Sequence, residues 1–235
     1  MEVNRFKSIK EGTILLIDKP YGWTSFDVVG KLRSLIKKYT GDKSVKIGHA
    51  GTLDPLATGL LVICTGKATK RVVDLTAGSK DYTAKIKLGE TTPSFDLETE
   101  VDATYPFEHV NRELVEVVLK TFKGWQMQEP PAFSAKYING KRAYEYARKG
   151  ITPRLEPVPI EIQNIELIDF NLPFIAFKIH CSKGTYIRAL ARDIGKALSS
   201  GAHLVELRRT RSGNFSIDQA LTITEVEEKL LNIRN

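Results

Sequence analysis

The sequence lacks most of the features that mark a specialised class of protein. Its 235 residues include only 2 cysteines, which excludes a disulfide-stapled fold and a zinc site made by cysteines alone. No apolar run reaches the roughly 18 residues of a membrane-spanning helix, and the apolar run near the N-terminus is too short for a secretory signal. The 17 Gly and 10 Pro are ordinary counts, which excludes collagen-like and low-complexity chains. We therefore expect a soluble protein of a reducing cytoplasm.

Common cofactor and metal motifs are missing as well. The sequence contains no GxGxxG, HExxH or CxxC, and Gly66-Lys67 is followed by Ala68 where a phosphate-binding loop requires Ser or Thr. The histidines are scattered along the chain, so a metal site has little support. We expect no cofactor and no metal.

Charge is present in excess and is unevenly distributed. The chain has 35 Lys and Arg against 28 Asp and Glu, a net charge of +7. Residues 1–80 hold 14 basic and 7 acidic groups, residues 81–130 hold 5 and 10, and residues 131–235 hold 16 and 11. Two basic flanks around an acidic middle suit a polyanionic partner such as nucleic acid. Charge alone is equally compatible with an ordinary enzyme of high isoelectric point.

Hydrophobic patterning predicts an α+β fold, because strands and helices mix without regular βαβ alternation. We expect one domain over residues 1–235, with a largely antiparallel central sheet flanked by helices and with residues 216–235 as a helical tail. Expected strands cover 13–18, 45–48, 60–66, 81–89, two stretches within 158–181, and 202–217. Expected helices cover 25–39, 69–75, 111–122 and 184–201, and a last one starts at 224.

Three segments carry more specific expectations. Phe26, Val29, Leu32, Leu35 and Ile36 are expected to share one apolar face of the first helix. Residues 90–108 are acidic and irregular and are expected to form an exposed excursion. Residues 134–150 predict a strand, a turn at Asn139-Gly140 and a helix.

The most unusual segment is GHAGTLDPLATG, residues 48–59, between two predicted strands. Its glycines allow close approach of the backbone to a ligand, and Asp54 is the only acidic residue between Asp42 and Asp74. The residues themselves leave two interpretations open. Asp54 is either a functional carboxylate or a cap for the turn at Pro55, and His49 is either a ligand contact or an ordinary loop histidine.

Two basic segments near the C-terminus could bind an anion. In CSKGTYIRALARDIG, residues 181–195, Lys183 and Arg188 place positive charge near a helix start, and Tyr186 offers a ring for stacking a base. In LRRTRSG, residues 207–213, the three arginines are candidate phosphate contacts or a solvated strand end. An amphipathic helix with its charges in water is the alternative for the first segment.

Together these segments resemble the TruB family of bacterial tRNA pseudouridine synthases. The resemblance covers about residues 12–215, in family order. It comprises TILLIDKPYGWTSFDVV (13–29), GHAGTLDPLATGLLVICTGKATK (48–70), KDYTAKIKLG (80–89), PPAFSAKYINGKRAYEYARKG (130–150), HCSKGTYIRALARDIG (180–195) and GAHLVELRRTRSGNF (201–215).

The resemblance implies an isomerase with the pseudouridine synthase fold. Such an enzyme breaks the N-glycosidic bond of a uridine in the T loop of tRNA, at position 55, rotates the base and rejoins it through carbon 5. By resemblance Asp54, Tyr82 and Arg188 are catalytic, and Arg188 pairs with Asp54. The remaining implied roles are substrate contacts by His49, Tyr82, Tyr186 and Leu207, and support of the site by Lys19, Pro20, Gly51 and Thr52. Candidate phosphate contacts are Lys183, Arg208, Arg209 and Arg211.

The expected partner is the T arm of tRNA, bound by a monomer that needs no membrane and no protein partner. About 20 residues follow the last motif, too few for the small C-terminal RNA-binding (PUA) domain that many family members carry. Two alternatives stay open. The same chemistry could act on another RNA with a T-loop-like hairpin, or the chain could bind or fold tRNA without catalysis.

Overall fold

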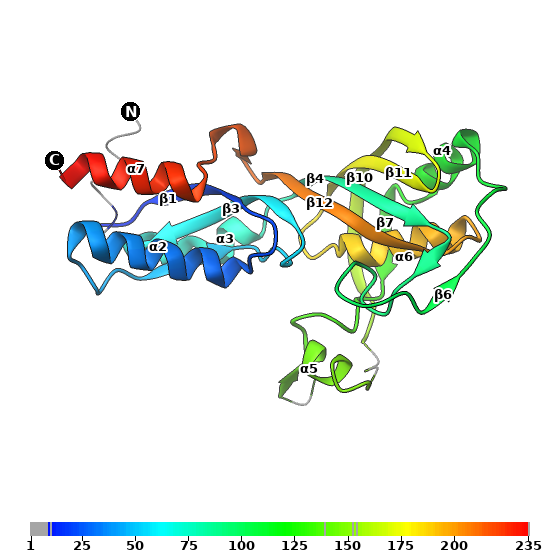
Figure 1. Cartoon of the computed structure of the whole chain (residues 1–235), viewed down its shortest axis with the longest axis horizontal. Helices are drawn as coiled ribbons and strands as arrows, with labels where there is room; N and C mark the ends of the chain where they lie inside the picture. The colour runs from blue at the N-terminus through cyan, green and yellow to red at the C-terminus, as the bar shows by residue number, and fades with distance from the viewer. Residues whose placement is uncertain (1–8, 10, 139, 152, 154, 235) are drawn as a thin grey trace. The chain divides into compact units, whose positions relative to one another are not determined.

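The structure, a computed structural model, describes residues 9, 11–138, 140–151, 153 and 155–234 (Figure 1). The chain forms two compact units, the first from Met1–Tyr82 with Leu207–Asn235 and the second from Thr83–Glu206. Both are mixed α+β units whose strand pairs are mostly antiparallel, so the predicted fold class is confirmed. No helix within the described ranges has both the length and the apolar character needed to cross a bilayer.

In the first unit, β3 is the central strand. It pairs antiparallel with β1 and β2 and parallel with β12, which reaches this unit at Leu207. Apolar side chains of β1, β2, β3, α2 and α7 form its main core, and Figure 1 shows α2 and α7 side by side. Its elements are β1 (Ile14–Lys19), α2 (Ser25–Thr40), β2 (Ile47–Ala50), β3 (Thr58–Thr65), η1 (Gly66–Arg71), α3 (Val72–Thr76), β12 (Ala202–Ser212), β13 (Phe215–Ser216), η2 (Ile217–Gln219) and α7 (Ile223–Arg234).

Helix α2 has a specific capping residue at each end. Thr24 and Asp27 form a capping box, in which each side chain accepts a hydrogen bond from the other residue's backbone N–H. Gly41 ends the helix in the left-handed conformation, with φ of 72°. The expected apolar face is correct with one exception: Phe26 is 76% exposed. At 100° per residue Phe26 lies at the margin of the stripe, where the core no longer covers it.

One glycine allows β3 and β12 to meet. Gly59 has φ of 99°, and a Cβ there would lie 2.8 Å from the backbone nitrogen of Arg209 and closer still to its carbonyl oxygen. No other residue fits this position without moving β12. The register it permits, Thr58 opposite Arg208 and Gly59 opposite Arg209, places the arginines of β12 beside the loop that precedes β3.

In the second unit the sheet order is β4-β11-β10-β7, and β10 pairs antiparallel with both β11 and β7. Helix α4 packs against β10 and against α6. The elements are β4 (Lys80–Leu88, which starts in the first unit), β5 (Glu90–Thr91), β6 (Ala103–Thr104), α4 (Arg112–Thr121), β7 (Gly124–Gln128), β8 (Tyr137–Ile138), β9 (Lys141–Arg142), α5 (Ala143–Ala147), β10 (Val158–Asn171), β11 (Phe174–Cys181) and α6 (Ile187–Ala197).

Three expectations for this unit need correction. The segment 90–108 is not simply an exposed excursion, because it contains the short strands β5 and β6 and buries Ser94 and Asp96. The helix expected over 184–201 spans only Ile187–Ala197. Strand β7 was not foreseen, because its edge position leaves alternate side chains in solvent and gives it no apolar run. Asn139, half of the predicted turn, lies outside the described residues.

Candidate active site

The loop between β2 and β3 carries Asp54, and its backbone is held at nearly every residue. Arg209 donates from Nη2 to the carbonyl oxygen of Gly51 at 2.9 Å and from Nη1 to that of Thr52 at 3.3 Å. The hydroxyl of Ser25 bonds to both the carbonyl oxygen and the N–H of Leu53, at 3.1 and 2.9 Å. Such clamping fixes where the neighbouring side chain points, because the peptide units on both sides cannot rotate.

The other side of Asp54 is held in the same way. The Pro55 carbonyl accepts from Lys19 Nζ at 3.2 Å and from the Gly22 N–H at 2.9 Å. The Asp54 carbonyl accepts from the Ala57 N–H at 3.1 Å, which closes a turn at Pro55. The turn expected at this position therefore exists, and it coexists with a rigidly presented carboxylate.

Lys19 is a buried cation close to that carboxylate. Its side chain is 0% exposed, and its ammonium group donates to three carbonyl oxygens, those of Pro20, Trp23 and Pro55. Burial lowers the pKa of Lys19 to about 8, while the negative charge of Asp54 acts in the opposite direction. Arg209 lowers the same pKa further. Two buried cations, Lys19 and Arg209, thus lie against a loop that contains a single acid.

His49 lies on β2, where its surroundings favour the neutral form of the imidazole. Burial and then the charge of Arg209 lower its pKa, so the imidazole does not gain a proton near neutral pH. Its ring meets the ring of Phe26 edge to face, with centroids 5.6 Å apart and planes at 88°. Within the described part of the chain, Nδ1 of His49 has no hydrogen-bond partner.

The arginines of β12 behave differently from one another. Arg208 forms a two-hydrogen-bond ion pair with Asp18, at 3.0 and 2.7 Å, and Arg211 does the same with Asp81, at 2.6 and 3.0 Å. Both side chains stay partly exposed. Arg209 is only 1% exposed and donates from Nε to the Leu60 carbonyl as well as to the loop. The expectation that Arg209 contacts phosphate is therefore wrong, because its guanidinium lies in the interior.

Two further predicted site residues lie on strands of the first unit. Tyr82 on β4 and Leu207 on β12 are largely buried. The Leu207 carbonyl accepts from the hydroxyl of Thr58, at 3.4 Å. Leu207 is thus largely shielded from solvent, and its role as an apolar wall that excludes water stays a prediction.

The second unit holds Tyr186 and Arg188 at the start of α6. The side-chain amide of Gln128 brackets the backbone of Tyr186, accepting from its N–H at 2.8 Å and donating to its carbonyl at 3.1 Å. Arg188 is buried, forms an ion pair with Asp96 at 3.5 Å, and donates to the carbonyls of Ser94 and Phe133 at 3.1 and 2.9 Å. The pairing of Arg188 with Asp54 stays a prediction.

Sequence reasoning missed Ser25, Gln128 and Asp96. Ser25 is only the first residue of the expected helix over 25–39, and Asp96 is one of several acids in an acidic segment, so no local pattern distinguishes either residue. Lys183, the remaining candidate phosphate contact, is exposed on the turn before α6. No group of His, Cys, Asp and Glu among the described residues could hold a metal ion.

Comparisons with known proteins identify the family. Residues 37–187 match the model of the N-terminal domain of the TruB family of pseudouridylate synthases, and residues 188–235 match that of a tRNA pseudouridylate synthase B C-terminal domain. The chain therefore belongs to the TruB family. It is 57% identical over 214 residues to a Bacteroides fragilis protein named tRNA pseudouridine synthase B, covering 91% of this chain and 92% of that protein. A Parabacteroides distasonis protein of the same name is 55% identical over 219 residues, or 93% of each chain.

A solved structure supports the fold. One chain of a crystal structure of a Cbf5-Nop10-Gar1 complex superimposes with a TM-score of 0.71 and 29% identity, covering 97% of this chain. This protein spans 56% of the length of that chain. The architecture described above is thus the pseudouridine synthase fold.

Proposed function

We propose that this protein converts the uridine at position 55, in the T loop of tRNA, to pseudouridine. The observation that carries the proposal is the presentation of Asp54, a carboxylate on a loop whose carbonyls at Gly51, Thr52, Leu53 and Pro55 are each held by a side chain from another segment. The names of the relatives support tRNA as the substrate. The protein acts as a monomer in the cytoplasm.

The reaction needs an ionised carboxylate, a sheltered base and a flipped nucleotide. Asp54 acts at the reacting nucleotide, and an essential carboxylate can attack carbon 6 of the ring, attack carbon 1 of the ribose or remove a proton. Tyr82 stacks on the target base and assists removal of the proton from carbon 5. Leu207 and Tyr186 are further candidate contacts to the base. The uridine must leave its loop, which costs a few kcal/mol, and His49 occupies the space that it vacates.

Phosphates of the T arm are bound at the surface of each unit. Arg208 and Arg211 keep part of their guanidinium groups exposed beside Asp18 and Asp81, and Lys183 is exposed next to α6. Recognition of a folded loop relies on shape, stacking and 2′-hydroxyl contacts more than on reading base edges in a groove. Affinity for T-arm RNA should therefore fall steeply with salt.

The test is release of tritium from a T-arm stem-loop labelled at carbon 5 of the target uridine, without added metal or cofactor. Wild-type protein should release tritium, and Asp54→Asn should not, while both bind the RNA with similar affinity. Full release by Asp54→Asn would overturn the catalytic role of Asp54. Binding without release by wild type, on the stem-loop and on whole tRNA, would show a tRNA-binding protein instead of an enzyme.

A further inference from the structure

The exposed side of α2 carries an aromatic ring and two cations to which the proposed function assigns no role. Phe26 is 76% exposed, so most of its ring is open to a ligand although one edge-to-face contact joins it to His49. Gly30, Arg33 and Lys37 follow Phe26 at intervals of four, seven and eleven residues, and all three are exposed. Those intervals return to the same side of a helix within about 40°, so the four residues form one stripe, here called the α2 stripe.

The α2 stripe starts beside Asp54. Ser25, the residue before Phe26, is hydrogen-bonded through its hydroxyl to both backbone groups of Leu53, the residue before Asp54. The ring of Phe26 also contacts His49, which lies on the strand that leads into the same loop. The aromatic end of the stripe is therefore anchored to the catalytic loop, within the same compact unit.

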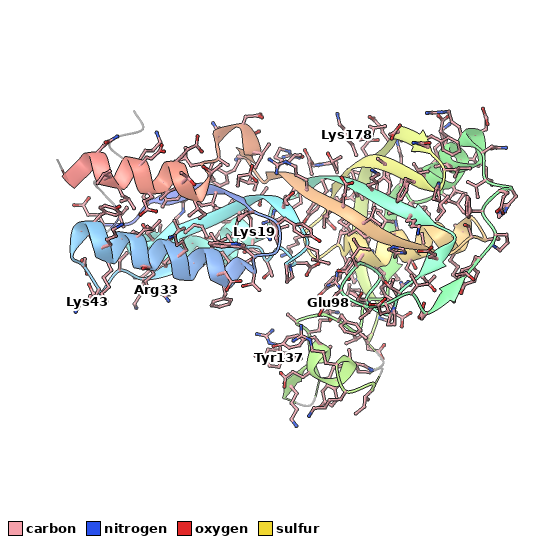
Figure 2. All side chains as sticks on the ribbon, in the orientation of Figure 1. Lys19, Arg33, Lys43, Glu98, Tyr137 and Lys178 are labelled. Atoms are coloured by element: carbon pink, nitrogen blue, oxygen red, sulfur yellow. The ribbon has the colours of Figure 1, made fainter. Side chains whose placement is uncertain are left out.

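Charge increases along the stripe with distance from the loop. A rise of 1.5 Å per residue places the Cα atoms of Arg33 and Lys37 about 10 and 16 Å from that of Phe26 along the helix axis. Figure 2 shows Arg33 on the side of α2 that faces away from α7, and Lys43 beyond the C-terminal end of the helix. The one acid of α2, Asp27, accepts from the N–H and the hydroxyl of Thr24 in the capping box, so its charge serves the helix end.

We propose that the α2 stripe binds the substrate RNA, with an unpaired base stacked on Phe26 and the phosphates of the adjoining strand over Arg33 and Lys37. An aromatic ring followed by spaced cations is the arrangement that single-stranded nucleic acid requires, because every base has a face to stack and every nucleotide carries one negative charge. An apolar peptide partner would leave the two cations without a counterpart. This inference rests on the proposed RNA substrate and adds to it a second contact beyond the nucleotide that reacts.

Phe26 is tested by replacement with alanine and, separately, with tyrosine. T-arm stem-loop affinity is measured by filter binding in an Asp54→Asn background, so that no turnover occurs. Phe26→Ala should weaken binding roughly tenfold, whereas Phe26→Tyr should retain it, because only the ring is required. In the active enzyme, Phe26→Ala should raise KM with little change in kcat, since the ring does not touch the reacting atoms.

The cations are tested by two double variants of the same helix. Arg33→Gln with Lys37→Gln should reduce the slope of log affinity against log salt by about 1.5, as expected for two lost phosphate contacts. Lys31→Gln with Lys38→Gln removes equal charge from the opposite side of α2, next to Glu227 on α7, and should leave the slope nearly unchanged. Equal slopes for the two double variants would overturn the proposal, and so would wild-type affinity in Phe26→Ala.

Two other outcomes separate this inference from its premise. If wild type releases tritium while every variant of the α2 stripe binds as wild type does, the stripe is not an RNA site and the proposed function stands. If wild type neither binds nor converts the stem-loop or whole tRNA, both proposals fail. A dimer in solution that Phe26→Ala converts to a monomer would assign the stripe to a second copy of the chain and would overturn the inference.

Discussion

Replacement of Arg209 by methionine should destabilise the first unit far more than the same replacement of its neighbour Arg208. Methionine keeps the length of the side chain but removes the three hydrogen bonds that the buried guanidinium donates to Leu60, Thr52 and Gly51. Each carbonyl left without a partner in the interior costs about 1–3 kcal/mol. The cost of burying the guanidinium is recovered at the same time, so we expect a net loss of about 3–5 kcal/mol.

Arg208 is the matched control because it is adjacent in sequence, has the same chemistry and lies on the same strand. Its side chain is 43% exposed and its partner Asp18 is also reached by water. An exposed ion pair contributes about 0–1 kcal/mol, so Arg208→Met should fall within that range. Both variants lose one positive charge, so the difference between their unfolding free energies reports the effect of burial.

The assay is urea unfolding followed by tryptophan fluorescence. The chain has 2 tryptophans, and Trp23 packs against the core of the first unit, while Trp125 is an exposed residue of β7 in the second unit. In a Trp125→Phe background the signal reports the first unit alone. Equal losses of unfolding free energy for Arg208→Met and Arg209→Met, or a loss below about 1 kcal/mol for Arg209→Met, would refute the reasoning.

Two further predictions concern Lys19 and the glycines. The pKa of Lys19 is 10.5 in the unfolded chain and about 8 in the fold, so its burial penalty is complete below pH 8 and is relieved as pH rises toward 10.5. Unfolding free energy of wild type minus that of Lys19→Met should therefore rise by about 2 kcal/mol between pH 7 and pH 10, and a flat difference would contradict the assignment. Gly59→Ala should lower the free energy of unfolding by more than about 3 kcal/mol. In Gly30→Ala the added Cβ has no atom within 4 Å, so this variant should stabilise α2 by about 0.5–1 kcal/mol. Thermal melts compare the two variants, and similar melting temperatures would contradict the role of Gly59.

Local sequence was sufficient wherever a rule acts within a few residues. The helices expected over 25–39 and 111–122 are present as α2 and α4, because their caps, Thr24 with Asp27 and Asn111, need only the next turn of the helix. Alternation of side chains predicted β4, and the apolar run predicted β3. The loop around Asp54 was identified by its glycines and by its single acid.

The rest depended on contacts between distant segments. Arg209 and Arg208 are indistinguishable in the sequence, yet the pairing of β12 with β3 turns one into the interior and leaves the other at the surface. Asp96 pairs with Arg188 because the acidic segment 90–108, whose composition is typical of exposed loops, buries this residue. Phe26 has the spacing of a core residue and is exposed.

The sequence by itself determined the local elements, the excess of positive charge and Asp54 as the candidate catalytic carboxylate. Only the tertiary structure decided that the Asp54 loop is supported by Lys19 and Arg209 and that Arg208 and Arg211 remain partly exposed. The physical reason is that local structure follows from dihedral preferences and caps, whereas the environment of a charge follows from which strands pair. In this protein Lys19 and Arg209 hold the Asp54 loop because β1, β3 and β12 meet at that loop, a juxtaposition that no stretch of sequence contains.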